Sequence, residues 1–335
     1  MSQLAEIIDG TDMLETDSFA SGEIEVSITK SVRGMDVILF TSCARNDSGL
    51  SADAAKIELY HTIDALKRSQ ARNIIIFEPF ISSSRSDRTT RRNSVGLWIH
   101  FKILASLGAK HILTYQLHSK ISQSMLDPSY CSLDDVSAVN LLEKYLCDHY
   151  IRNLEYLQKT VRPNWVFCSV DAGGDDEVRD FADAFGTSLV IAHKQRDYSK
   201  VNTVKSINIL SSEPVEGKIL WIVDDLMDTA GSVETLIRAL EPLKPAEVNI
   251  IAVHAVLSHP AVRRLNQLYS EGLLKRIIVT DTIFHSDEKI ESLEVVSSTE
   301  LSARIIHTFM TNQSMKELMD KFNAEEYLKT SGLFS

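Results

Sequence analysis

The chain has 335 residues, of which 44% are apolar, 24% charged and 7% aromatic. This is the composition of an ordinary globular protein, so intrinsically disordered and fibrous classes are excluded. The length predicts two domains of roughly 150 residues each. The 46 acidic and 35 basic residues give a net charge of −11, which argues against a nonspecific nucleic-acid binder or a protein held on anionic membranes.

Neither export nor membrane insertion is predicted. No run of the sequence approaches the roughly 20 apolar residues that a bilayer span needs, and the acidic N-terminus lacks the basic and apolar parts of a secretory signal. The four cysteines, Cys43, Cys131, Cys147 and Cys168, are far apart in the sequence and form no CxxC pair. We therefore expect buried free thiols in a cytoplasmic protein, rather than disulfides or metal ligands.

Apolar runs and helical periodicity alternate along the chain. In the first half, strands are predicted at 35–41, 73–77 and 111–115, and helices at 51–69 and 93–107. In the second half, strands are predicted at 165–169, 188–192, 218–223, 247–254 and 274–280, and helices at 176–185 and 232–243. Two further helices are predicted at 301–311 and 314–330.

This alternation predicts an α/β fold with two similar domains, each a mostly parallel sheet covered by helices on both faces. The polar stretch 120–135, which holds Pro128, is the candidate boundary. We therefore divide the chain into an N-terminal domain at 1–133, a C-terminal domain at 134–298 and a helical extension at 299–335.

The strongest motif follows the strand predicted at 218–223. Two acids, Asp224 and Asp225, lead into a short loop, and a helix begins near Ser232. Ligands of open α/β sheets bind beyond the carboxyl ends of strands, and free N–H groups at a helix N-terminus suit a phosphate. Thr229 and Ser232 add hydroxyl donors, and Gly231 permits close approach of the backbone. The two acids can hold sugar hydroxyls or a hydrated Mg²⁺, whereas the plain alternative is a strand-end turn with an ordinary serine cap.

This segment resembles the phosphoribosyl-pyrophosphate loop of type I phosphoribosyltransferases and their relatives. From about Phe19 to about Ile306, the chain resembles ribose-phosphate pyrophosphokinase (PRPP synthetase), a family with two phosphoribosyltransferase-like domains. That family transfers a diphosphate from ATP to the C1 hydroxyl of ribose 5-phosphate. The resemblance implies a ribose 5-phosphate site with the following members: Asp224, Asp225, Asp228, Thr229, Ala230, Gly231 and Ser232.

Three further segments resemble the ATP-binding parts of the family. Phe19 and Glu23 match the adenine-binding segment, Arg85 and Asp87 match an arginine–glutamine–aspartate segment that contacts ATP, and His118 matches a Mg²⁺ ligand that also contacts ATP. A guanidinium fork at Arg85 can grip two phosphate oxygens. The plain alternatives are a solvent loop, a solvated basic loop and a structural histidine.

Two segments of the second half match the reaction centre of the family. Asp171, Ala172, Gly173 and Gly174 resemble the diphosphate loop, whose aspartate belongs to the metal site, so the implied metal residues are His118 and Asp171. Glycines after a strand free backbone donors for a diphosphate.

Lys194 and Arg196 resemble the basic pair of a flexible catalytic loop. Their implied role is to neutralise charge on the transferring diphosphate. In an extended segment, their spacing of two would point both side chains to one face. The plain alternative is a charged loop.

The sequence departs from the family pattern on the nucleotide and diphosphate side. Ser21, Ser86 and Gln116 stand where the family has aspartate, glutamine and aspartate, and acids occupy 175–177, where a basic residue is usual. Arg179, shortly after them, can compensate. Only 18 residues precede Phe19, fewer than the family's first strand and helix usually occupy.

Three hypotheses follow. The chain is an active diphosphokinase that uses ATP, ribose 5-phosphate and Mg²⁺, or a non-catalytic homologue that regulates an active synthetase, or a phosphoribosyltransferase. Lys194, Arg196, His118 and Asp171 favour the first, because a purely structural homologue has no need of them. The resemblance also implies a homo-oligomer built from dimers, with a hexamer as one option, and neither nucleic acid nor membrane as partner.

Overall fold

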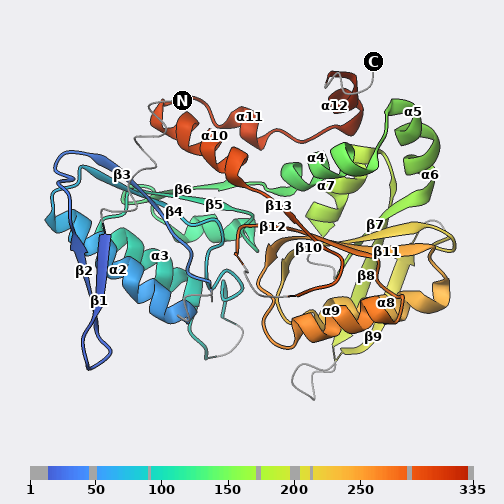
Figure 1. Ribbon diagram of the computed structural model, residues 1–335, viewed down its shortest axis with the longest axis horizontal. Coiled ribbons are helices and arrows are strands. Elements are labelled where there is room, and N and C mark those ends of the chain that lie inside the picture. Colours follow the sequence, from blue (N-terminus) through green and yellow to red (C-terminus); the bar gives the residue numbers. More distant parts are fainter. Residues whose placement is uncertain are drawn as a thin grey trace. The chain divides into compact units, whose positions relative to one another are not determined.

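The computed structural model describes residues 14–44, 51–89, 92–170, 175–196, 204–211, 214–284 and 289–330 (Figure 1). The chain forms two compact units, which are described separately. Unit 1 comprises Met1–Val136, Ile283–His285 and Ile306–Gln313, and unit 2 comprises Ser137–Thr282, Ser286–Ile305 and Ser314–Ser335. The predicted division at 133/134 and 298/299 stays a prediction.

Unit 1 is built on a four-stranded parallel sheet. Its strands are β3 (Asp36–Phe40), β4 (Asn73–Phe77), β5 (His111–Tyr115) and β6 (Ser132–Val136), in that order across the sheet. β4 and β5 have the bounds that their apolar runs predicted. Both are almost wholly buried, as a strand covered on its two faces should be.

Two helices cover one face of this sheet, α2 (Ala52–Arg68) and α3 (Gly96–Leu107) (Figure 1). The side chain of Ser51 accepts the N–H of Ala54 at 3.2 Å and begins α2. Gly108, at φ 108°, ends α3 in a left-handed conformation that costs glycine little. The core between sheet and helices comes from alternate strand residues and from one face of each helix: Leu59, Ile63, Leu66, Ile74, Ile76, Leu97, Phe101, Leu104 and Ile112.

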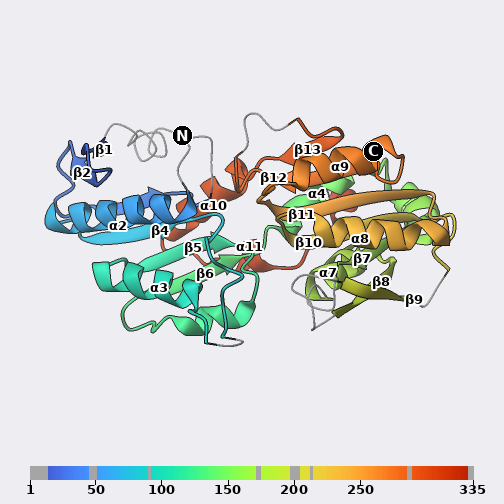
Figure 2. The same cartoon turned by 90° about the horizontal axis from the view of Figure 1, so that it is seen from below.

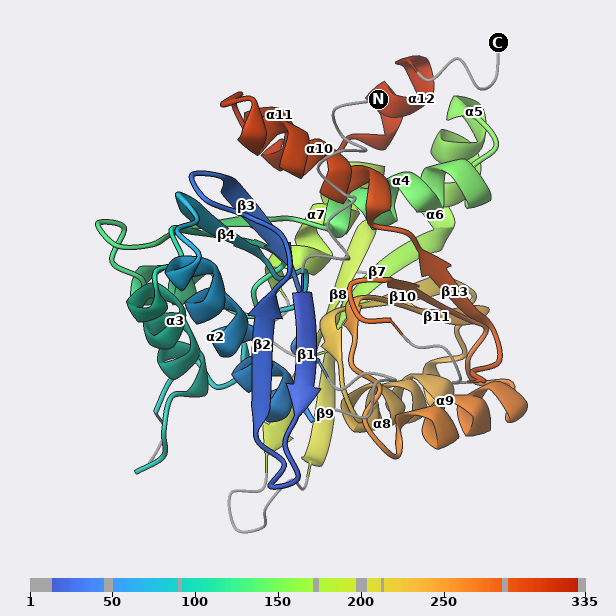
Figure 3. The ribbon, with the colours of Figure 1, turned by 60° about the vertical axis from the view of Figure 1, so that its left-hand side comes forward.

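A two-stranded antiparallel hairpin precedes this sheet, although the sequence predicted no strand before residue 35. β1 (Leu14–Ser18) pairs with β2 (Ile24–Ile28), and the hairpin lies beside α2 (Figure 3). The hydroxyl of Thr16 donates to Glu58 of α2 at 2.9 Å. Most of the hairpin side chains are exposed or half-buried, so the apolar run that marks a buried strand is missing from its sequence.

Unit 2 contains a seven-stranded sheet in the order β13-β12-β11-β10-β7-β8-β9. All neighbouring strands are parallel except β8 and β9. The strands are β7 (Trp165–Ser169), β8 (Ser188–Arg196), β9 (Val204–Ser211), β10 (Ile219–Met227), β11 (Glu247–Ala255), β12 (Arg276–Thr280) and β13 (Leu293–Val296).

Helices cover both faces of this sheet (Figure 2). α8 (Gly231–Leu240) and α9 (Ala261–Ser270) pack on one face, where they share a core with alternate strand residues such as Ile222 and Ile250. α4 (Val139–Tyr150) and α7 (Asp175–Phe185) contact each other on the other face. There, the rings of Trp165, Phe167, Phe181, Phe185 and Trp221 pack together. The predicted α/β class with mostly parallel sheets is therefore confirmed.

Shorter elements complete the described chain. They are η2 (Lys120–Met125) in unit 1 and α5 (Leu154–Tyr156), η3 (Leu157–Val161), α6 (Arg162–Asn164) and η4 (Glu241–Leu243) in unit 2, with α10 (Thr299–Met310) crossing between the units. The prediction of one helix at 314–330 is wrong, because α11 (Lys316–Met319) ends at Asp320 and α12 (Ala324–Thr330) begins later. Asp320 has an extended backbone, which interrupts the helix.

Two further expectations can be compared with the structure. All four cysteines are buried free thiols, as the sequence predicted. Of the helices in the described ranges, none has both the length and the apolar character that a membrane span needs.

Candidate functional site

The topology of unit 2 marks one point of its sheet as a ligand site. From β7, the chain runs to β8 and β9 on one side, and from β10 it runs to β11, β12 and β13 on the other. The order of strands therefore reverses between β7 and β10. Crevices at such reversals, outside the carboxyl ends of the strands, are where α/β sheets bind ligands.

The predicted ribose 5-phosphate segment lies at this point. β10 pairs with β7 only as far as Val223, opposite Ser169, but it pairs with β11 as far as Met227. Asp224 and Asp225 therefore lie in the part of β10 that extends beyond its pairing with β7. Both side chains are half-buried. The strand ends four residues later than predicted because β11 pairs with it as far as Met227.

α8 is separated from the end of this strand by three residues, 228–230, and its N-cap residue provides no side-chain cap. Its first residue is Gly231, and Ala230 precedes it in a left-handed conformation (φ 55°, ψ 11°) without a side-chain cap. The predicted start at Ser232 is therefore one residue late, and the alternative of an ordinary serine cap is wrong. Asp228 is half-buried and Thr229 exposed, so this turn presents polar groups and backbone donors together.

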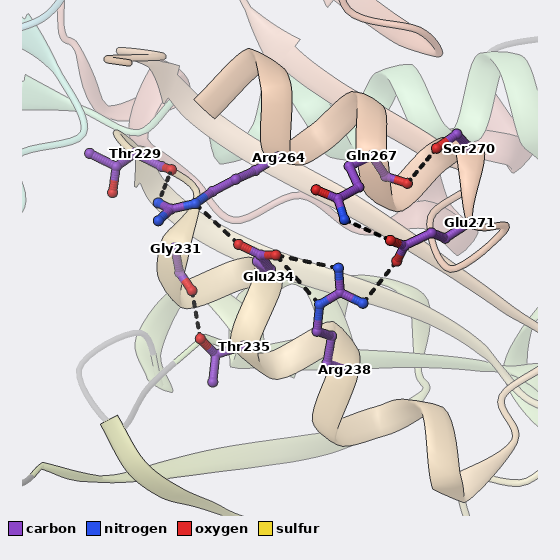
Figure 4. A network of polar contacts seen from close by, with 9 residues as sticks. All are labelled: Thr229, Gly231, Glu234, Thr235, Arg238, Arg264, Gln267, Ser270 and Glu271. Carbon is purple, nitrogen blue, oxygen red and sulfur yellow. Dashed lines mark hydrogen bonds and ion pairs between the residues drawn. The ribbon is translucent and has the colours of Figure 1, made fainter. Parts of the chain in front are cut away.

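An arginine of α9 fixes the turn (Figure 4). Arg264 donates through one terminal nitrogen to the carbonyl oxygen of Thr229 at 2.8 Å, and its Nε lies 3.1 Å from Glu234 of α8. A Cβ at position 231 would lie 2.9 Å from the same terminal nitrogen. A larger residue at position 231 would therefore make the end of the arginine side chain shift away from the turn.

The ion pairs continue from Glu234 along the same surface. Glu234 also pairs with Arg238 at 3.4 Å, and Arg238 donates to Glu271 of α9 at 2.8 Å (Figure 4). Sequence reasoning missed Arg264, because an arginine in an amphipathic helix carries no signal for the loop that it meets in the fold.

The predicted diphosphate residues Asp171, Ala172, Gly173 and Gly174 lie outside the described residues. The chain leaves β7 at Ser169 just before them, on the β7 side of the reversal. The acidic departure at 175–177 forms the first turn of α7. Acids are favourable at a helix N-terminus, which is a structural reason for that run.

Lys194 and Arg196 belong to β8, which continues past the predicted end at residue 192 and pairs with β9. The prediction of a loop is therefore wrong for the backbone of 193–196. Their side chains lie outside the described part of the chain, so the shared orientation stays a prediction. The pairing register shifts between Gln195 and Arg196, which interrupts regular alternation of the strand.

In unit 1, the hairpin turn brings Phe19 and Glu23 together. The N–H of Phe19 donates to the carbonyl oxygen of Glu23 at 2.8 Å, and Gly22, at φ 87°, closes the turn. Phe19 is 55% exposed, so its ring is available to stack on a planar ligand. Ser21, which replaces the family's aspartate, donates to the carboxylate of Glu23 at 2.8 Å.

Arg85 and Asp87 follow β4 in the loop before α3. Arg85 is exposed and Asp87 half-buried. Ser86, between them, has a local structural role, because its hydroxyl oxygen accepts the N–H of Gly96 at 2.9 Å. Its carbonyl oxygen accepts the N–H of Leu97 at 3.2 Å. These bonds start α3 at Gly96, three residues later than predicted.

His118 is exposed and follows the end of β5, which is the neighbour of β4 in the sheet. Gln116, which replaces the family's aspartate, is instead buried and has a left-handed backbone, with φ 41°. Asp135 of β6 accepts the N–H of Leu117 at 3.0 Å, and its burial raises the pKa of that carboxyl. Three of the predicted ATP residues, Arg85, Asp87 and His118, thus follow the carboxyl ends of two adjacent parallel strands.

Metal binding was assigned to His118 and Asp171. Asp171 lies outside the described residues, and within those residues no group of three or more histidine, cysteine or acidic side chains could hold a metal ion. A Mg²⁺ that arrives with a polyphosphate needs only one or two protein ligands, because phosphate oxygens and water supply the others. The exposed imidazole of His118 is compatible with that kind of site.

The chain was compared with known protein families. Residues 9–108 match the family model described as the N-terminal domain of ribose phosphate pyrophosphokinase. Residues 148–289 match the model described as the phosphoribosyl transferase domain.

Whole proteins and a solved structure match over most of the chain. The ribose-phosphate pyrophosphokinase of Bifidobacterium longum is 32% identical, over 93% of this chain and 87% of its own length. That of Chlorobaculum tepidum is 29% identical, over 93% and 88%. The crystal structure of phosphoribosylpyrophosphate synthetase from Mycobacterium smegmatis matches with a TM-score of 0.76 and 28% identity, over 93% of this chain and 96% of that one.

Proposed function

The chain belongs to the ribose-phosphate pyrophosphokinase family, and we propose that it transfers a diphosphate from ATP to the C1 hydroxyl of ribose 5-phosphate. The products are 5-phosphoribosyl 1-diphosphate and AMP. The observation that carries the proposal is the turn between β10 and α8, where two acids and a helix N-terminus with alanine at its N-cap meet at the strand-order reversal. That combination suits a phosphorylated sugar.

Different groups of the turn would bind the phosphate and the sugar of ribose 5-phosphate. The N–H groups of Gly231 and Ser232, together with the hydroxyls of Thr229 and Ser232, would hold the 5-phosphate. Asp224 and Asp225 would accept hydrogen bonds from the ribose hydroxyls. Because Arg264 holds the carbonyl of Thr229 and approaches Gly231, the turn is supported before the substrate arrives, which lowers the entropic cost of binding.

Residues of unit 1 would bind the nucleotide. The Phe19 ring would stack on adenine beside Glu23, and Arg85 would bind phosphate oxygens. Mg²⁺, when bound by His118, Asp171 and the phosphates of ATP, would neutralise charge on the polyphosphate. The residues of this chain position the two substrates for in-line attack on the β-phosphorus.

In that attack, the oxygen of the C1 hydroxyl forms a bond to the β-phosphorus. The bond from this phosphorus to the oxygen of AMP breaks, and the proton of the hydroxyl passes to solvent. Lys194 and Arg196 would stabilise the charge on the transferring diphosphate. We also propose that the chain works in the cytoplasm, which four buried free thiols support, and as a homo-oligomer.

The test is AMP release from ATP with ribose 5-phosphate and Mg²⁺, with each component omitted in turn. We expect release only in the complete mixture and a loss of at least about 100-fold in Lys194→Ala, the scale of a lost transition-state charge contact. The matched control is Lys159→Ala, because Lys159 is an exposed lysine of unit 2 that forms its ion pair with Glu155, four residues earlier.

Two results would contradict the proposal. AMP release unchanged in Lys194→Ala would show that this residue is not catalytic. No release by the wild-type chain, with ribose 5-phosphate still bound in calorimetry, would favour the regulatory homologue and direct the search to a catalytic partner.

A further inference from the structure

Two buried polar side chains and a half-buried tyrosine are hydrogen-bonded together in unit 1. The hydroxyl of Tyr60 in α2 lies 2.8 Å from Nδ1 of His100 in α3, and Nε2 of His100 lies 3.0 Å from the carboxylate of Glu78. Glu78 is the residue directly after β4. Its side chain is 0% exposed and that of His100 is 1% exposed. None of the three belongs to the predicted ATP or ribose 5-phosphate residues.

One arrangement of protons satisfies every atom of this chain of hydrogen bonds. Tyr60 stays protonated, because burial raises the pKa of its phenol and the neighbouring Cys43 and Glu78 add to that effect. In the neutral tautomer with the proton on Nε2, His100 accepts from Tyr60 at Nδ1 and donates to Glu78 from Nε2. The nearby Cys43 thiol also stays protonated, because burial and the Glu78 carboxylate raise its pKa. All donors thus point along one direction, toward Glu78.

Glu78 also forms a hydrogen bond with the start of the loop that carries Arg85 and Asp87. Its second carboxylate oxygen accepts the backbone N–H of Ser82, which is itself buried, at 3.3 Å. Between β4 and that loop, the carbonyl oxygen of Pro79 accepts the N–H of Tyr115 at 3.2 Å. We call the hydrogen-bonded series Tyr60, His100 and Glu78 the relay. It supports the start of the loop at the strand end where β4 and β5 lie side by side.

Two more side-chain bonds hold the rest of the loop. Lys56 of α2 donates to the hydroxyl of Ser83 at 2.7 Å, and Ser83 has a left-handed backbone with φ 70°. Ser86 accepts the N–H of Gly96, as described above. A loop fixed at residues 82, 83 and 86 has little freedom at Arg85, which lies between the last two.

Stability alone does not explain why such groups are buried. Taking a carboxylate out of water is costly, and apolar side chains of similar volume are often neutral or stabilising replacements for a buried ionic group. The neighbours of His100 on the same helix face, Leu97, Phe101 and Leu104, are all apolar and fully buried. A histidine at this core position is therefore better explained by the direction that it imposes on its neighbours than by the energy that it adds.

We propose that Tyr60, His100 and Glu78 are positioning residues, which hold the loop at 82–87 in the form that binds the polyphosphate of ATP. The inference rests on the proposed function, since it assigns ATP to Arg85 and Asp87. It names a support for the nucleotide that lies in unit 1 and leaves the ribose 5-phosphate turn of unit 2 untouched.

The decisive variant replaces the whole relay at once, with Tyr60→Phe, His100→Phe and Glu78→Leu in one chain. Because the new side chains are apolar and of similar volume to those that they replace, we expect a melting temperature equal to or above that of the wild type. We expect KM for ATP to rise about tenfold, the size of one or two lost buried hydrogen bonds, with KM for ribose 5-phosphate unchanged. His100→Gln can still donate to Glu78 and accept from Tyr60, so it should retain most of the ATP affinity.

The control is Leu104→Ala, which removes buried volume on α3 without removing a relay bond. It should lower the melting temperature and leave KM for ATP unchanged. If the triple variant does not fold, Tyr60→Phe removes a single hydroxyl and should raise KM for ATP about threefold.

The outcomes separate this inference from the proposed function. A wild-type chain that binds neither ATP nor ribose 5-phosphate overturns both. An active wild type whose relay variants bind ATP normally overturns only the inference. A rise in KM for ATP that also appears in Leu104→Ala overturns it as well, because general loosening of the core would then be the cause.

Discussion

Arg264 offers the sharpest test of how the turn that we propose for ribose 5-phosphate is built. Replacing it by alanine removes its hydrogen bond to the carbonyl of Thr229, its ion pair with Glu234 and its approach to Gly231. None of the implied substrate-binding residues changes. The turn between β10 and α8 would therefore keep its own polar groups but lose the support that the α9 side chain gives to it.

The expected loss follows from the exposure of the arginine. A hydrogen bond from a charged donor contributes about 1.5–3 kcal/mol when it is well shielded. The side chain of Arg264 is 30% exposed, so water competes for both partners and the surface ion pair adds little. We therefore expect a loss of about 1 kcal/mol, which is roughly a fivefold rise in KM for ribose 5-phosphate. KM for ATP should stay within about twofold of the wild type, because the residues proposed to bind the nucleotide belong to unit 1.

Steady-state kinetics with each substrate varied in turn would measure both constants. Arg238→Ala is a matched control, because Arg238 pairs with the same Glu234 and with Glu271, and neither pair involves the turn residues at 228–230 (Figure 4). It should leave KM for ribose 5-phosphate unchanged. The reasoning is refuted if Arg264→Ala has a normal KM for the sugar phosphate, or if both variants raise it equally.

Three further variants test other parts of the chain. Burial raises the pKa of Glu143 to about 9 from its ordinary 4.5, so its contribution to stability is complete below about pH 4.5 and is lost as the pH rises toward 9. Glu143→Gln should therefore melt higher than the wild type at pH 8, with a smaller decline from pH 6 to 8, and equal slopes in the two proteins would contradict this. Ser86→Ala removes the acceptor for the N–H of Gly96 and should lower the melting temperature by about 3 °C, corresponding to about 1 kcal/mol; an unchanged melting curve would show that the bond adds nothing. Phe19→Ala should raise KM for ATP about tenfold if the ring stacks on adenine, whereas alanine at Phe284, which is 68% exposed, should not; equal effects would exclude a specific stacking role.

The central strands could be predicted from sequence because burial on both faces leaves an apolar run. This is why β4, β5 and β7 have the bounds that their sequences indicated. β6 escaped prediction because it is an edge strand with the sequence SLDDV, in which two aspartates interrupt the apolar residues. One of them, Asp134, lies 2.9 Å from Nε2 of His111 in β5. A polar contact across the sheet thus replaces the apolar signal.

The candidate site divides in the same way. Asp224, Asp225 and Gly231 could be found because they follow one another at the end of a single strand. Arg264 could not, since it comes from a helix that meets the turn only after β11 has formed. His100 did leave a signal, because it interrupts the apolar series Leu97, Phe101 and Leu104 on one face of α3. A single sequence does not reveal which carboxylate and hydroxyl satisfy such a histidine.

The departures from the family pattern in unit 1 are compatible with activity, because each has a local role in the fold. The shorter side chain of Ser86 places its hydroxyl on the N–H of Gly96 and begins α3. Gln116 is buried at a left-handed backbone position, where a neutral amide costs less to bury than a carboxylate would. Ser21 donates to Glu23, so it orients the acid that remains beside Phe19. Since these side chains help to build the segments that would hold the nucleotide, their replacement changes how ATP is supported, and it gives no reason to conclude that ATP is no longer bound.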